Sequence, residues 1–352
     1  MFGRMMNNFY YGKSGKGDFK KEDLPRTRWQ LFWEMLRVRF AALFRLNLMT
    51  VAVWLPMIIV LGSLVTNLIS VVNVEAQYQM YLEDGTLTES FTEESLKAIE
   101  QMGVTDMASM NALSTQAVAD VIFRTLLLLI PCIAITGPVQ AGLAYVTRNW
   151  SRDEHAFIWA DFKDAVKDNW KQGLGVSLIT SVFPIIIYVG YRFYGEQAAG
   201  GSMFFMVPQM LMLVIGAVWA LALVFMYPML VTYKVTFGQL IKNSIIMAVG
   251  RLPQTVGIRL ILLVPSAACI AAFFLTGSPI AMLVLGAYYI LFGFAFARFV
   301  GASYTNGVFD KFINSHMEGV QVNRGLASDE DDEDEEEEPA AETANEADKE
   351  NN

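Results

Sequence analysis

Residues 136–172 read TGPVQAGLAYVTRNWSRDEHAFIWADFKDAVKDNWKQ. This stretch leaves one apolar run, turns at Gly137-Pro138, becomes polar and charged, and ends where the next apolar run begins. The sequence on both sides is hydrophobic over lengths that allow a helix to cross a bilayer. We therefore interpret residues 136–172 as the longest connection between two membrane spans on the cytoplasmic side of the protein.

The composition is that of a membrane protein rather than a soluble domain. Of 352 residues, 54% are hydrophobic, and the mean hydropathy is +0.37. Soluble domains are about 45–50% apolar even when glycine is counted. The formal net charge of −9 arises in the C-terminal tail, because the residues from Ser328 onward hold 14 of the 35 acidic residues and one of the 26 basic residues. The rest of the chain therefore carries a net charge of +4.

Six stretches are long and apolar enough to cross about 30 Å of hydrocarbon as helices. They lie near residues 48–72, 118–136, 173–193, 204–232, 256–276 and 279–300. The sequence thus predicts an all-α, polytopic bundle of six transmembrane helices.

The distribution of Lys and Arg predicts the orientation of the spans. Ten basic residues precede the first span, whereas the next connection, residues 73–117, carries only Lys97 against eight acidic residues. The later connections alternate in the same way, and basic residues accumulate on the cytoplasmic side of membrane proteins. We therefore expect a multi-pass protein of the cell membrane with both termini in the cytoplasm. No cleavable signal is visible, so the chain should insert through its own spans.

Two amphipathic helices are predicted on the cytoplasmic surface. The first carries aromatic and leucine side chains on one face and polar or charged side chains on the other, and it leads into the first span. The second lies within residues 147–172, where Lys163, Lys167 and Lys171 form a stripe at helical spacing. Trp150 and Trp159 fit an aromatic belt at the membrane interface. The apolar face of the first helix comprises Trp29, Phe32, Trp33, Leu36, Phe40, Leu43 and Phe44.

Three regions follow from these assignments. Residues 1–27 are predicted to be disordered, 28–320 to form the membrane domain, and 321–352 to form a disordered acidic tail, which contains ten consecutive acids at 329–338. Within the extracytoplasmic connection 73–117, Ser90-Phe91-Thr92-Glu93 predicts a capping box and Gly103 a helix stop, so we expect a small helical cap there.

No motif for enzymatic chemistry stands out. His155 beside Glu154 is the one acid–base or metal hypothesis, and His316 is the other histidine of the chain. H-E-x-x-H, G-x-S-x-G and phosphate-binding glycine-rich motifs do not occur. Cys132 and Cys269 each lie inside an apolar run, where a small hydrophobic role is expected. We therefore predict no catalytic residues, no bound metal and no cofactor.

The motif of the central stretch resembles the YesL-like family of bacterial integral membrane proteins, whose biochemical activity is uncharacterised. The residues that carry the resemblance lie at 136–138, 141–148, 154–159, 161–165 and 169–172, and the resemblance extends over 28–320. It implies an accessory role in carbohydrate import, with a carbohydrate permease or another membrane protein as partner. This chain differs from shorter relatives by its full 73–117 connection and its acidic tail. The candidate motif residues, of unknown role, are Gly137, Pro138, Tyr145, Arg148, Glu154, His155, Trp159, Asp161, Phe162, Asn169 and Trp170.

Several function classes remain open at the level of sequence. An accessory component of carbohydrate uptake is favoured by the resemblance. A standalone small-molecule carrier is the first alternative, because prolines inside the spans can kink helices around a cavity. A membrane scaffold that engages cytoplasmic partners through the acidic tail is the second. An intramembrane enzyme would have to use Glu154, His155, Asp161 and Asp164. The expected partners include the lipid bilayer and exclude nucleic acid.

Overall fold

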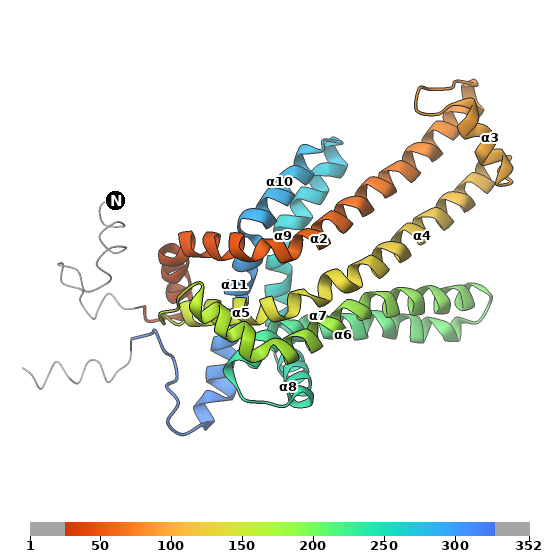
Figure 1. The fold of residues 1–352 in the computed structure, drawn as a ribbon. Helices are drawn as coiled ribbons and strands as arrows, with labels where there is room; N and C mark the ends of the chain where they lie inside the picture. Colours follow the sequence, from red (N-terminus) through yellow and green to blue (C-terminus); the bar gives the residue numbers. More distant parts are fainter. Residues whose placement is uncertain (1–24, 328–352) are drawn as a thin grey trace, which may run out of the picture. The chain divides into compact units, whose positions relative to one another are not determined.

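The computed structural model describes residues 25–327, and the regular structure in this range is helical (Figure 1). Within it, Thr88 and Phe91 form an isolated antiparallel bridge and no strand occurs. Six helices in the described range are long and apolar enough to cross a membrane, which confirms the predicted all-α, six-span architecture. Residues 1–24 and 328–352 lie outside the described residues, and with them most of the segments predicted to be disordered.

The helices of the described range follow one another with short connections. Two 3-10 turns, η3 and η5, and one π-helical turn, η4, interrupt or end the α-helices. In chain order the elements are α2 (Arg28–Asp84), α3 (Glu93–Gln101), α4 (Met107–Ala134), α5 (Thr136–Trp150), α6 (Ala160–Ala199), η3 (Met203–Phe205), α7 (Met206–Thr232), α8 (Phe237–Gly250), α9 (Leu252–Thr276), α10 (Ile280–Tyr288), η4 (Tyr289–Gly293), α11 (Phe294–Phe312) and η5 (Asn314–His316).

The chain divides into two compact units. Of the described residues, unit 1 contains 25–48, 142–165 and 256–327, and unit 2 contains 49–141 and 166–255.

Both predicted amphipathic helices are continuous with the spans that follow them. α2 runs from Arg28 to Asp84 without interruption, and α6 begins at Ala160 and continues to Ala199. Trp159, just before α6, is 64% exposed. Trp150 is only 1% exposed, so its assignment to an interfacial belt is wrong: it packs inside unit 1.

In unit 2, α2 and α4 form a long hairpin that α3 closes at its tip (Figure 1). Both helices extend well into the predicted connection 73–117, beyond the limits of the predicted spans. The extension is stabilised because side chains from both helices and from α3 share a small buried core, which the span-length criterion ignores. The buried members are Tyr78, Phe91, Leu96, Ile99, Val104 and Met110.

The caps of this tip differ in detail from the sequence prediction. The N-cap of α3 is Thr92, two residues after the predicted Ser90, and its hydroxyl accepts from the Ser95 N–H at 3.4 Å. Gly103 has φ +85°, which agrees with its predicted role as a stop. A capping box that the sequence analysis missed starts α4, where Asp106 Oδ1 accepts from the Ser109 N–H at 2.8 Å. The Ser109 hydroxyl, which donates to Asp106 Oδ1 at 2.7 Å, and then the Ser109 N–H hold the pKa of the Asp106 carboxyl below its usual value.

The Gly137-Pro138 step breaks the helix as predicted: α4 ends at Ala134 and α5 starts at Thr136. Gly137 then meets Gly173 of α6 at backbone distance, since a Cβ on Gly173 would lie 2.9 Å from the Gly137 carbonyl oxygen. Ser177 Oγ donates to the Ala134 carbonyl at 2.6 Å beside this contact. Small residues therefore let the first turn of α5 approach α6 closely within unit 2.

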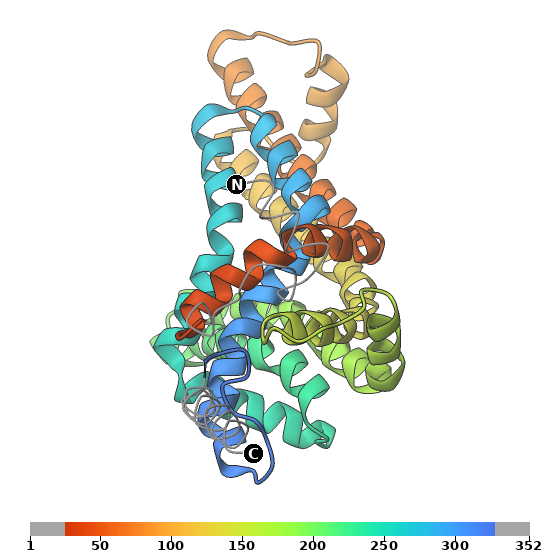
Figure 2. The ribbon, with the colours of Figure 1, turned by 90° about the vertical axis from the view of Figure 1, so that its left-hand side faces the viewer.

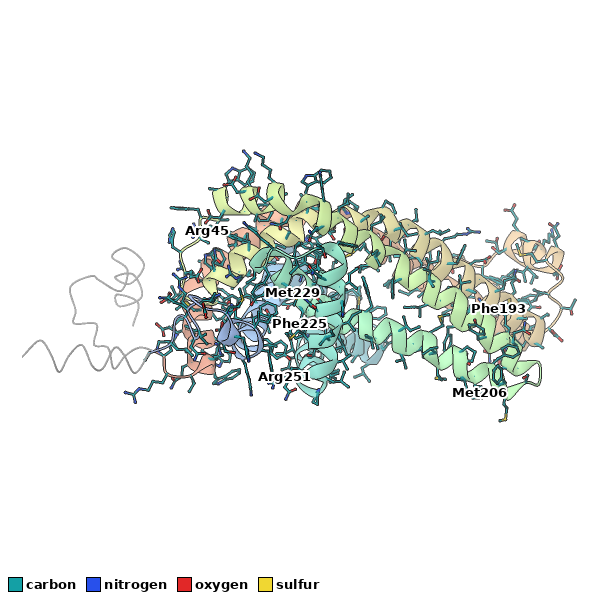
Figure 3. The ribbon with its side chains drawn as sticks, turned by 90° about the horizontal axis from the view of Figure 1, so that it is seen from below. Arg45, Phe193, Met206, Phe225, Met229 and Arg251 are labelled. Carbon is teal, nitrogen blue, oxygen red and sulfur yellow. The ribbon has the colours of Figure 1, made fainter. Side chains whose placement is uncertain are left out.

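Helices α6 and α7 form a second hairpin of unit 2. Phe193 and Met206 lie at its closed end in Figure 3, and Phe225 and Met229 lie further along α7. Phe183 of α6 stacks on Trp219 of α7 with ring centroids 4.6 Å apart. Helix α8 follows α7 and was missed by the sequence analysis, although its capping box of Thr236 and Gln239 is visible in the sequence.

In unit 1, α9 and α10 lie side by side as a tight hairpin (Figures 1 and 2). Pro279 is the N-cap residue of α10, close to its predicted place in the first turn. After α10 the chain passes through the π-helical turn η4 before α11 begins. Asn47 of α2 is fully buried and hydrogen-bonds to the backbone of this turn. Its Nδ2 donates to the carbonyls of Tyr289 and Ile290 at 3.0 and 2.7 Å, and its Oδ1 accepts from the Ala295 N–H at 2.9 Å.

Candidate functional site

The polar centre of unit 1 begins at the turn between α5 and α6. Backbone hydrogen bonds fold this turn back on α5, from Ser151 N to the Thr147 carbonyl and from Glu154 N to the Asn149 carbonyl. Asp153 takes φ +57°, a left-handed conformation that Asp tolerates better than most residues. The Trp150 indole N–H donates to the Ala156 carbonyl at 3.3 Å and so fixes the far side of the turn.

Glu154, the acid of the sequence motif, lies between two arginines. Its Oε1 is 3.3 Å from Arg152 Nε and 3.2 Å from Arg324 Nη1. Both contacts are ion pairs without hydrogen-bond geometry. The side chains of Arg152 and Glu154 are 7% and 19% exposed, so water screens this pair less than a surface ion pair. The second arginine comes from the C-terminal end of the described chain.

A second carboxylate, Asp310 at the end of α11, organises the other side of this centre. It is 3% exposed and lies 2.5 Å from Arg28 Nη2 at the start of α2. The same carboxylate accepts from the Asn314 side chain and, at 3.2 Å, from the Asn323 backbone N–H. Arg28 also donates to Asn323 Oδ1 at 2.8 Å. One buried acid thus connects the start of α2, the end of α11 and the segment after η5.

α11 is also tied directly to the turn after α5. The Asn306 side-chain amide donates to Ser151 Oγ at 2.7 Å and to the Arg148 carbonyl at 3.3 Å. Asn306 is 3% exposed, and Arg148 Nη1 donates to Asn149 Oδ1 at 3.1 Å. These hydrogen bonds tie α11 and the end of α5 to the turn within unit 1.

We call residues 323–327 the C-terminal clamp. They were predicted to belong to the disordered acidic tail that begins at 321, but they contact both Asp310 and Glu154. The Ala327 N–H also donates to the Pro25 carbonyl at 3.1 Å. Gly325 sits against the turn after α5, with φ +86° and room for no side chain, because a Cβ would lie 2.8 Å from the Arg152 carbonyl oxygen.

Replacing Gly325 with alanine should release the C-terminal clamp. The added methyl would collide with the Arg152 backbone and would also strain a positive φ, so the docked conformation should lose most of its population. Gly319→Ala is the matched control, because Gly319 has φ +74° but nothing within 4 Å of its Cβ position. Hydrogen exchange of the amides at Asn323 and Ala327 should rise in Gly325→Ala and stay near wild type in Gly319→Ala. Equal protection in both variants would show that the Arg152 contact does not hold the clamp.

The structure divides the eleven candidate residues between the units. Gly137, Pro138, Asn169 and Trp170 belong to unit 2, and the other seven belong to unit 1. Only Arg148 and Glu154 among those seven join the polar centre described above.

The other motif residues have local roles in helix ends and packing. Asp161 Oδ2 accepts from the Phe157 N–H at 2.8 Å and so caps the start of α6, while Phe162 is 8% exposed. His155 is exposed and lies edge-on to the Phe157 ring. Trp170 is 48% exposed and lies beneath the Lys171 ammonium.

Sequence reasoning missed the residues that complete the centre. The missed residues lie near the two ends of the described chain, far from the motif, and are Arg28, Asp310, Asn323 and Arg324. One signal was available, since Asp310 is the only carboxylate between residues 200 and 317. Within residues 25–327, no group of three His, Cys, Asp or Glu side chains is arranged to hold a metal ion.

Residues 117–191 match the family described as "Protein of unknown function, DUF624". The matched segment contains most of α4, all of α5, the turn with Glu154 and the greater part of α6, and thus every candidate motif residue. No curated protein and no solved structure matches the chain.

Proposed function

We propose that this multi-pass membrane protein is a non-catalytic accessory component of a carbohydrate-uptake system in the cell membrane. The carbohydrate assignment rests on the resemblance of residues 28–320 to the YesL-like family. The match of residues 117–191 to the DUF624 family supports the choice of the central stretch as the diagnostic part of the chain.

The accessory role is supported by one observation: polar side chains of the motif are engaged in ion pairs and helix caps within the protein. Glu154 is neutralised by Arg152 and Arg324, and Asp161 caps a helix. Side chains engaged in this way fix the shape of a surface rather than offering a proton or a nucleophile to a substrate. Beside them, Phe157 and Trp159 are 63% and 64% exposed, and large exposed aromatic side chains are suited to contact with a lipid interface or a partner protein.

Affinity purification from detergent-solubilised native membranes tests this proposal. Tagged full-length protein should recover a permease or its solute-binding protein in near-stoichiometric amounts. Phe157→Ala combined with Trp159→Ala should reduce that recovery, whereas Leu178→Ala, an exposed position on the membrane-spanning part of α6, is the control. Recovery of the bare chain alone would contradict the accessory role and favour a standalone carrier.

The proposed orientation places the clamp and both termini in the cytoplasm. Single cysteines at Lys97 and at Met317, in a variant with Cys132 and Cys269 replaced, should differ in their reaction with a membrane-impermeant maleimide on intact cells. The Lys97 position, in α3, should react, and the Met317 position, exposed after α11, should react only after lysis. The reverse pattern would overturn the orientation derived from the Lys and Arg distribution.

Two substitutions test whether Glu154 has a structural role that His155 does not share. If Glu154 holds the clamp, Glu154→Gln should raise the proteolytic sensitivity of residues 323–327, because the ion pair with Arg324 is lost. His155→Ala should leave that sensitivity unchanged, since His155 is exposed and outside the polar centre. Wild-type sensitivity in Glu154→Gln would contradict the structural role of this carboxylate.

A further inference from the structure

A groove in unit 2 lies between α2 and α4, away from the polar centre of unit 1. Its volume is about 220 Å³. The polar side chains on its walls include Asn67, Ser70 and Ser114, and the apolar ones include Val71, Ala117 and Val121. Ligand sites for whole drug-sized molecules usually measure ~300–1,000 Å³, so this groove suits one part of an elongated ligand.

Ser114 has a buried hydroxyl that needs a partner. Its side chain is 6% exposed, and among the described residues its Oγ has no hydrogen-bond partner. Buried hydroxyl groups are nearly always hydrogen-bonded, because an unpaired one loses its bonds to water without replacement. Asn67 differs, since its Nδ2 already donates to the Ser63 carbonyl at 2.8 Å and to Ser63 Oγ at 3.1 Å.

The groove lies where the apolar runs of the two helices end together. The predicted first span ends at residue 72 and the predicted second begins at 118, and groove residues fall on both sides of these limits. Beyond the limits lies the buried core of the hairpin tip, which shares Met110 with the groove wall. This level corresponds to the edge of the hydrocarbon layer, whichever side of the membrane it faces.

We propose that this groove binds one acyl chain of a membrane glycerolipid and that the Ser114 hydroxyl donates to the ester carbonyl of that chain. The ester groups of glycerolipids lie at the edge of the hydrocarbon layer, the level that the span limits assign to Ser114. The chain then runs along Val71, Ala117 and Val121 toward the membrane centre. A sugar fits poorly, because its many hydroxyl groups would face a mainly apolar wall. The site is independent of the proposed carbohydrate role.

Photolabelling of the full-length protein in nanodiscs tests the proposal. The probe is a phosphatidylcholine with a diazirine on one acyl chain, diluted into unlabelled phosphatidylcholine and phosphatidylglycerol. After irradiation, peptides covering residues 65–74 and 110–121 should carry several times more label than the exposed face of α9 around Leu263 and Val264. Label spread evenly over these helices would show ordinary lipid contact and would overturn the proposal.

Two variants and one control distinguish labelling that results from binding in the groove from labelling that results from general contact with lipid. Ser114→Ala should lower the labelling of these peptides about fivefold, the effect of one net hydrogen bond. Ala117→Phe should abolish it by filling the groove, while Ala112→Phe, on an exposed position of the same helix, should leave it unchanged. Ser114→Ala changes little volume, so it remains informative if Ala117→Phe does not fold. Unchanged labelling in Ser114→Ala, or crosslinks to a second copy of the chain in place of lipid, would contradict the site.

Discussion

Asn47→Leu is expected to destabilise unit 1 strongly. The side chain of Asn47 is 0% exposed and supplies three hydrogen bonds to the backbone around η4. Each hydrogen bond contributes about 0.5–1.5 kcal/mol net, and each buried group left unpaired costs about 1–3 kcal/mol. Leucine keeps the volume but removes all three, so we expect a loss on the order of 3–5 kcal/mol.

The π-helical turn explains why this side chain matters. A π turn displaces the regular ladder of backbone hydrogen bonds, and in lipid no water is available to satisfy the displaced groups. The Ala295 N–H is buried, and Asn47 Oδ1 is its hydrogen-bond partner at 2.9 Å. The Asn47 side chain thus replaces hydrogen bonds that the backbone lacks where η4 passes into α11.

Thermal unfolding in detergent, followed by fluorescence-detected size exclusion, measures the effect. Asn47→Leu should give a much lower midpoint or no monodisperse peak. Asn73→Leu is the matched control, because Asn73 lies on the same helix but is exposed. A midpoint for Asn47→Leu equal to that of Asn73→Leu would mean that the three hydrogen bonds add no net stability.

Gly137→Ala is the second substitution with a large expected effect. An alanine Cβ would overlap the Gly173 carbonyl oxygen and Ser177 Oγ, and would lie 2.7 Å from the Gly173 carbonyl carbon. Because two of these atoms belong to the backbone of α6, a rotamer change cannot relieve the clash, and the helices must separate. Overpacking of this kind costs about 1–3 kcal/mol, and a backbone clash lies at the upper end of that range.

Two controls make the result specific to the α5–α6 contact. Gly62→Ala, in α2, meets nothing within 4 Å and should raise stability slightly, since glycine inside a helix costs about 0.5–1 kcal/mol relative to alanine. Adding Ser177→Ala to Gly137→Ala should not restore stability, because the Gly173 carbonyl remains in place. Restored stability in this double variant would show that the hydroxyl, and not the close backbone approach, limits the contact.

The sequence was sufficient for features that depend on local composition. Six apolar runs predicted six helices, because the free energy of placing a helix in lipid is a sum over its own residues. The break at Gly137-Pro138 and the stop at Gly103 were also predictable, since both depend on backbone preferences of the residues concerned. Local composition did not indicate that tertiary packing extends α2 and α4 as helices past their apolar runs, at the tip of their hairpin.

The candidate site was only partly predictable, for a related reason. The motif brought attention to Arg148 and Glu154, which do belong to the polar centre. It could not indicate Arg28, Asp310 or Arg324, because hydrogen bonds and ion pairs depend on positions in space. Arg28 and Asp310 are separated by 282 positions in the chain.

The sequence by itself determined that this protein is a set of six apolar helices, and it located the turn at which the central stretch leaves the second of them. The tertiary structure decided which polar groups pair: Asn47 with η4, Asp310 with Arg28, and Glu154 with Arg324. Hydrophobicity is a property of each residue and can be read along the chain. A buried hydrogen bond requires two groups within about 3 Å of each other, and only the packed fold sets that distance.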